Sequence, residues 1–158
     1  RNYFHAIVIF FLLSYNRKVF LKFRQERSHN KMKKIIKTDK APAAIGPYSQ
    51  AIEVNGMIFT SGVIPINPAT NELVTGDITV QADQAIGNLA ALLKAAGSSL
   101  EQVVKTVVFV KNMDDFAKVN EIYGKYFEKD FPARSCVEVA RLPKDVLIEI
   151  EAIALKGE

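Results

Sequence analysis

The chain has 158 residues, 49% hydrophobic and 24% charged, which is typical of one globular domain with an ordinary core. The chain has 21 basic and 17 acidic residues, of which seven basic residues and one acidic residue lie in residues 1–31. The remainder has 14 basic and 16 acidic residues, a net charge of −2, and so lacks the basic surface of a nucleic-acid binder. Residues 32–158 contain no histidine and one cysteine, which excludes a Ser-His-Asp or Cys-His catalytic group, a His/Cys zinc site and a disulfide within one chain.

The first 31 residues differ from the rest. Residues 6–13 form an apolar run that is shorter than the roughly 20 residues needed to span a bilayer, and bases follow it instead of a small-residue cleavage pattern. Met32 begins a sequence typical of a native start. We therefore interpret residues 1–31 as an extension outside the fold, foreign to the native protein, with a targeting segment or a membrane-surface helix as alternatives, and residues 32–158 as the domain.

Strand and helix signals then follow along the domain. Asn55-Gly56 is a strong hairpin signal between two short β-like runs. From Thr79 apolar residues recur at helical spacing until Gly97, and a second helix is expected after Asp114, which can cap it; its core stripe includes Phe116 and Tyr123. Strands are expected over residues 34–38, 51–54, 57–61, 103–110, 134–139 and 147–154. The order β-β-β-α-β-α-β-β predicts an α+β domain, one mixed six-stranded sheet with two helices on one face.

The last strand has two different faces, because side chains alternate along a strand. Ile148 and Ile150 suit the helix-covered face, whereas Glu149, Glu151 and Ile153 point the other way. A solvated face would not need bulky apolar groups. We therefore expect this second face to contact another subunit.

Three separated motifs resemble those of one known family. Residues 132–139 (PARSCVEV), followed by Leu142-Pro143-Lys144 and residues 148–151 (IEIE), resemble the signature of the reactive-intermediate deaminases, the Rid or YjgF family. Residues 43–50 (AAIGPYSQ) resemble its first motif, and Thr60-Ser61-Gly62 with Ile64-Pro65 its second. The resemblance extends from about residue 33 to residue 156 without an obvious break.

The resemblance implies a chorismate-mutase-like fold and a homotrimer with active sites between subunits. It implies hydrolysis of 2-imino acids, 2-aminoacrylate/2-iminopropanoate and 2-iminobutanoate, to 2-keto acids and ammonia. These imines are products of pyridoxal-phosphate-dependent dehydratases. No cofactor, metal, nucleic acid or membrane is implied for the domain. A cytoplasmic location is expected, or an organellar one if the extension is a transit peptide.

Two residues match the family's catalytic positions. Arg134 matches the arginine that binds the substrate carboxylate, for which a planar guanidinium is suited. Glu149 matches the glutamate that holds the attacking water. By alternation alone Glu151 faces the same side, so motif position decides between them. Arg141 is interpreted as a turn residue.

Four further residues match positions around the substrate. Tyr48 follows Gly46-Pro47 in a turn and either contacts substrate at the cleft wall or packs; Ser61 and Gly62 match substrate contacts. Cys136 shares a strand face with Arg134 and is expected to line the same cleft. Without a neighbouring base to form the thiolate, we interpret it as a contact and not as the nucleophile.

Two other functions use the same features. A non-catalytic, ligand-binding trimer that regulates a partner protein would retain Arg134 and Glu149. A ribonuclease is disfavoured by the acidic balance, the absence of histidine from the domain and the lack of an aromatic-basic stripe.

Overall fold

The computed structural model describes residues 33–157. The extension predicted over residues 1–31 therefore lies outside the described residues. The strands are β1 (Lys34–Ile36), β2 (Ala51–Val54), β3 (Met57–Thr60), β4 (Ile66–Asn67), β5 (Glu72–Leu73), β6 (Val103–Val110), β7 (Ala133–Glu138) and β8 (Ile148–Leu155). The helices are α2 (Ile78–Ala95) and α3 (Phe116–Tyr126), with short 3₁₀ turns η1 (Leu100–Gln102), η2 (Met113–Asp115) and η3 (Pro143–Asp145).

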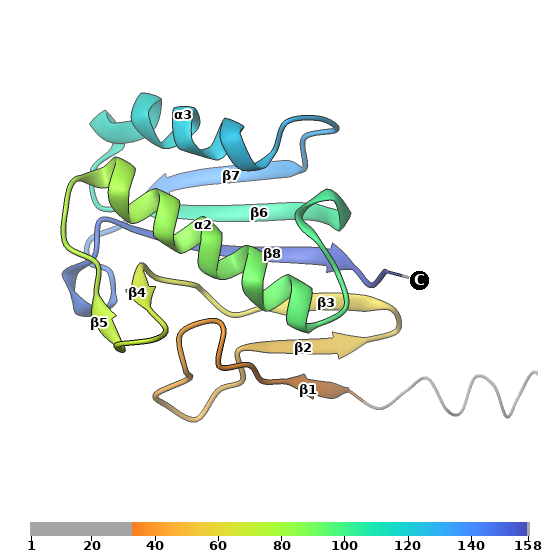
Figure 1. The fold of residues 1–158 in the computed structure, drawn as a ribbon. Helices are drawn as coiled ribbons and strands as arrows, with labels where there is room; N and C mark the ends of the chain where they lie inside the picture. The colour runs from red at the N-terminus through yellow and green to blue at the C-terminus, as the bar shows by residue number, and fades with distance from the viewer. Residues whose placement is uncertain (1–32, 158) are drawn as a thin grey trace, which may run out of the picture. The chain divides into compact units, whose positions relative to one another are not determined.

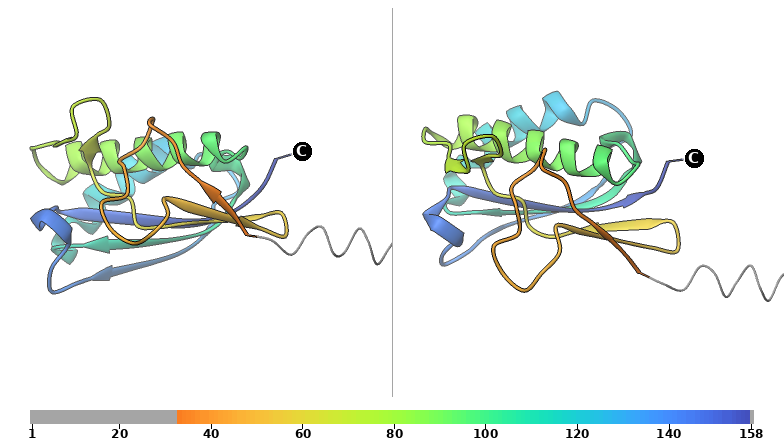
Figure 2. Two further views of the ribbon diagram at one scale, coloured as in Figure 1. Left: turned by 90° about the horizontal axis from the view of Figure 1, so that it is seen from below. Right: turned by 60° about the horizontal axis from the view of Figure 1, so that its bottom comes forward.

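Six of the strands form one mixed sheet in the order β1-β2-β3-β8-β6-β7. Strands β6 and β7 are parallel and all other neighbours are antiparallel. Both helices pack on one face of this sheet (Figures 1 and 2). The predicted α+β class, strand count and helix placement are confirmed. The short β4–β5 ribbon was not predicted, because two-residue strands carry no periodicity.

The helix α2 begins where a side chain replaces missing backbone partners. Asp77 caps α2 by accepting hydrogen bonds from the backbone N–H groups of Thr79 and Val80. The cap predicted at Asp114 was wrong. Asn112 accepts a hydrogen bond from the Asp114 N–H at the start of η2, and α3 begins only at Phe116.

The other face of the sheet carries a row of apolar side chains beside charged ones. Ile35, Ile52, Phe59 and Ile153 lie in register across four adjacent strands on this face. No described helix covers it (Figure 2), and Ile35 and Phe59 are exposed to 61% and 39%. The predicted mixed face is therefore present, and its contact with another subunit stays a prediction. In the part of the chain that the structure describes, neither helix has the length and apolar character needed to cross a bilayer.

Candidate active site

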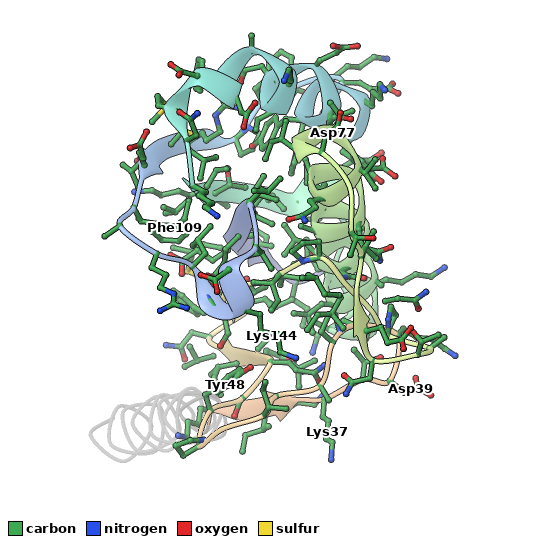
Figure 3. All side chains as sticks on the ribbon, turned by 90° about the vertical axis from the view of Figure 1, so that its left-hand side faces the viewer. Lys37, Asp39, Tyr48, Asp77, Phe109 and Lys144 are labelled. Atoms are coloured by element: carbon green, nitrogen blue, oxygen red, sulfur yellow. The ribbon has the colours of Figure 1, made fainter. Side chains whose placement is uncertain are left out.

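A hollow at one end of the sheet contains Glu149. It is formed by the loop before β2, the segment after β3 and the loop before β8. Tyr48 and Lys144, which come from the first and the last of these segments, are labelled in Figure 3. The lining residues are Ile45, Tyr48, Ser61, Gly62, Ile64, Pro143, Lys144 and Glu149. Motifs in the sequence predicted Tyr48, Ser61, Gly62 and Glu149 as site residues, and the structure brings these four together.

Gly62 and Glu149 are in direct contact. Val63 and Ile150 form an antiparallel bridge with backbone hydrogen bonds of 2.8 and 3.0 Å. Gly62 and Glu149 therefore lie diagonally across this bridge on the same face, and the Glu149 side chain reaches over to Gly62. A Cβ atom at residue 62 would overlap Oε1 of Glu149 and lie 2.6 Å from its Cδ. The absence of a side chain at Gly62 therefore makes room for the carboxylate over the backbone.

Ser61 fixes the loop that carries Tyr48. Its hydroxyl donates a 2.7 Å hydrogen bond to the Ser49 carbonyl, and its N–H donates to the Gln50 carbonyl. Gln50 in turn is buried and donates to the carbonyls of Thr38, Ala41 and Pro42. Ser61 thus positions the loop and at the same time lines the hollow. The Tyr48 side chain is half exposed beside it.

The environment of Glu149 makes its carboxylate more basic. Burial is the main cause that raises the pKa of Glu149, and the nearby charge of Glu151 raises it further. Within residues 33–157, no group donates a hydrogen bond to this carboxylate. A half-buried carboxylate that lacks a protein donor is suited to hold a water molecule and accept its proton. Glu151 shares the strand face but does not line the hollow.

Arg134 is held by α3. Its Nη2 atom donates a 2.7 Å hydrogen bond to Oδ1 of Asn120. The guanidinium lies 4.6 Å from the ring centroid of Tyr123 and 5.5 Å from that of Phe116. The Arg134 guanidinium is therefore held by one amide and two aromatic rings, which fix the orientation of its plane.

Asn120 was missed by the sequence analysis, which also assigned Phe116 and Tyr123 to the core stripe alone. Phe116 is in fact 39% exposed and stands beside the arginine. The available signal was spacing: Asn120 lies four residues after Phe116 and three before Tyr123, so the three share one helix face.

Cys136 lies on the same sheet face as Arg134, as alternation predicts. It pairs in register with Val108 on β6, two residues along from the Arg134–Thr106 pair. Burial raises the pKa of the Cys136 thiol, and the charge of Arg134 only partly opposes this. The side chain is thus a thiol at neutral pH, which argues against a nucleophile.

Arg134 and Glu149 do not share a face. Arg134 pairs with Thr106, whose hydroxyl is hydrogen-bonded to the Tyr123 hydroxyl of α3, so this face is the helix-covered one. Glu149 pairs with Phe109, three residues further along β6, and so points to the uncovered face. Within one chain, the structure therefore separates the two residues that sequence analysis assigned to one site.

One other expectation concerns a side chain near the hollow. Arg141 is a turn residue, as predicted: its Nε and Nη2 atoms donate hydrogen bonds of 2.8 and 2.9 Å to the Asp145 carboxylate. Across residues 33–157, no three His, Cys, Asp or Glu side chains are grouped as potential metal ligands.

The chain is similar to known proteins along most of its length. The Endoribonuclease L-PSP family matches residues 38–156. The 2-iminobutanoate/2-iminopropanoate deaminase of Escherichia coli is 56% identical over 128 residues, 79% of this chain and 99% of that protein. A RutC family protein of Pyrococcus horikoshii is 57% identical over 125 residues, 79% of this chain and 99% of that protein.

Solved structures of similar sequence have the same fold as this chain. Escherichia coli TdcF with bound serine is 47% identical with a TM-score of 0.75, covering 78% of this chain and 99% of that one. RidA from an Antarctic Psychrobacter is 43% identical with a TM-score of 0.75, covering 77% and 98%.

Proposed function

Because this chain belongs to the Endoribonuclease L-PSP family, which includes the reactive-intermediate deaminases, we propose that it hydrolyses short 2-imino acids to 2-keto acids and ammonia. The observation that carries the proposal is the Glu149 carboxylate, half-buried over Gly62 and without a donor among the described residues. The high identity to a relative named as an imine deaminase supports the same chemistry.

The reaction needs one activated water. Glu149 accepts a proton from water as the water oxygen bonds to C2 of the imine, and the imine nitrogen takes up a proton to become an amine. In the resulting carbinolamine the hydroxyl then gives up its proton while the amine nitrogen gains one, the C–N bond breaks as the C=O bond forms, and ammonia leaves the 2-keto acid. General base catalysis contributes about 10²–10⁴-fold, which is substantial for imines that also hydrolyse unaided.

Arg134 supplies the other half of the site. One of its donors is used by Asn120, and the remaining N–H groups of the fork can pair with a substrate carboxylate. Since Arg134 and Glu149 point to opposite faces of one sheet, the proposal requires Arg134 from a second copy of the chain. A homotrimer with sites between subunits meets this requirement, and the uncovered apolar face offers a surface for it.

The proposed substrates are 2-aminoacrylate/2-iminopropanoate and 2-iminobutanoate, which are released by dehydratases that use pyridoxal phosphate. Their removal would protect other enzymes from reactive imines. We place the reaction in the cytoplasm, where such dehydratases act, and without a cofactor.

A coupled assay tests the proposal. Serine dehydratase generates 2-aminoacrylate, and pyruvate release is followed with and without this protein, in the presence and absence of a chelator. Faster release, insensitive to the chelator, is expected. Unchanged release together with measurable binding of 2-oxobutanoate would instead support a non-catalytic ligand-binding protein.

A further inference from the structure

The turn that carries Lys144 into the Glu149 hollow has an unusual backbone. Lys144 has φ 56° and ψ 20°, and the next residue, Asp145, also has φ 56°. The Val146 N–H donates to the Pro143 carbonyl at 3.4 Å, which closes a four-residue turn around them. Two successive central residues with positive φ favour glycine, asparagine or aspartate.

Asp145 has local reasons to adopt this conformation, but Lys144 has none. Aspartate tolerates the left-handed region, and the two hydrogen bonds from Arg141 hold the Asp145 carboxylate in place. The Lys144 side chain makes no hydrogen bond or ion pair with the residues that the structure describes. Left-handed backbone is unfavourable for such a residue, and strain of this kind is concentrated at functional sites.

The charge of Lys144 complements that of the hollow. Of the eight lining residues, only Lys144 and Glu149 carry charge. An anionic substrate that approaches the Glu149 carboxylate is repelled by it, and Glu151 nearby adds to the repulsion. A cation at the rim offsets this repulsion at the moment of entry.

We propose that Lys144 is a substrate-binding residue, whose ammonium attracts the carboxylate of the 2-imino acid into the hollow. Lys144 is one of the residues that line the hollow, and it does so from a left-handed backbone. The inference rests on the proposed function for the identity of the substrate. It assigns to this chain's own hollow an anion-recognition group besides Arg134 of a second copy.

The test compares Lys144→Gly and Lys144→Arg with the wild type in the deaminase assay. The glycine variant should raise KM for 2-iminobutanoate about fivefold to tenfold, between the effect of an exposed ion pair and that of a charge-assisted hydrogen bond. Its kcat should change less than twofold, and Lys144→Arg should restore most of the loss. Higher salt should raise the KM of the wild type more than that of Lys144→Gly, because the variant has lost one of the charges that attract the substrate.

Thermal melting separates binding from a structural role. Glycine relieves the left-handed strain, so Lys144→Gly should melt at the wild-type temperature or above it. Lys94→Ala, a charge removed at the end of α2, and Asn71→Gly, another positive-φ residue, should keep the wild-type KM. Unchanged KM in Lys144→Gly, or equal losses in kcat and stability, would overturn the inference.

Calorimetry with 2-oxobutanoate makes the outcome independent of turnover. If the wild type proves inactive, the proposed function fails, and the affinity for 2-oxobutanoate decides the role of Lys144. Weaker binding to Lys144→Gly than to the wild type supports it. Equal binding, or none to either protein, overturns it.

Discussion

Arg134 and Glu149 lie on opposite faces of one sheet, on strands that both pair with β6. Arg134 pairs with Thr106 and is held by Asn120 under α3, while Glu149 pairs with Phe109 on the uncovered face. The two side chains can therefore act on one substrate only if they come from different copies of the chain. This separation makes the assembly itself part of the proposed chemistry.

Mixed oligomers test that requirement. Arg134→Ala and Glu149→Gln should each be nearly inactive, but assembled together they should recover activity. Half of the chains then supply an intact Arg134 and half an intact Glu149, so about a quarter of the interfaces contain both. Pyruvate release by the mixture, against each variant alone, measures this. A mixture no more active than its components would contradict a site shared between chains.

Gly62→Ala should remove activity while the fold survives. The added Cβ meets Oε1 of Glu149, which is the end of a flexible side chain, so the carboxylate moves and the backbone does not. Gly62 lies outside the positive-φ region, so alanine fits its backbone. We expect kcat to fall about 10²-fold, as for loss of the general base, with a melting temperature close to that of the wild type.

The control for this variant is Gly124→Ala in α3. No atom lies within 4 Å of the Cβ that it adds. It should keep full activity and melt slightly higher, because alanine is the better helix former. Wild-type activity in Gly62→Ala would show that the position of the Glu149 carboxylate does not matter for the reaction.

Arg134→Ala should lower kcat/KM about 10–150-fold, the equivalent of about 1.5–3 kcal/mol for a hydrogen-bonded charged group. Arg134→Lys should not restore it fully, because an ammonium lacks the planar fork. Asn120→Ala should lower kcat/KM by less than Arg134→Ala does, mainly through a higher KM, since Tyr123 still stacks on the guanidinium. Lys125→Ala, which removes an exposed charge from the same helix, is the matched control and should have no effect.

Sequence reasoning predicted the scaffold well because the signals are local and periodic. The apolar stripe from Thr79 to Gly97 and the Asn55-Gly56 turn each fix one element and its boundaries to within a few residues. The four residues of the Glu149 hollow were found through motifs. In the sequence they are up to 101 positions apart, and only the fold brings them together.

What the sequence could not give depends on strand pairing and on backbone angles. Alternation places Arg134 with Cys136, and Glu149 with Glu151, but says nothing about whether two strands present these pairs to the same face. The parallel register of β6 and β7 decides that. In the same way, no composition or spacing signal indicates that Lys144 has a positive φ, because lysine is unusual there.

Glu149→Gln should lower kcat about 10²-fold or more with a smaller change in KM, since glutamine keeps the size but cannot accept the proton. Glu151→Gln is the matched control on the same face. It should retain most of the activity and shift the pH–rate profile to lower pH, because it removes one cause that raises the pKa of Glu149. If Glu151→Gln lost its activity and Glu149→Gln kept it, the general base would be Glu151 and not Glu149.

Glu149→Gln should also stabilise the fold at neutral pH. Burial and the charge of Glu151 raise the pKa of Glu149 above its ordinary 4.5, so the folded state binds this proton more tightly than the unfolded state. The resulting stabilisation is complete below pH 4.5 and is lost as pH rises through the folded-state pKa, which leaves the wild type with a buried charge at pH 7.

Glutamine never acquires that charge. The variant should therefore melt above the wild type at pH 7, and the difference should shrink as the pH is lowered toward 4. Glu121→Gln, an exposed change on α3, should show a smaller difference. A variant that melts below the wild type at pH 7 would contradict the burial penalty. It would mean that a cation, such as Arg134 of a second copy, already compensates the carboxylate in the assembled protein.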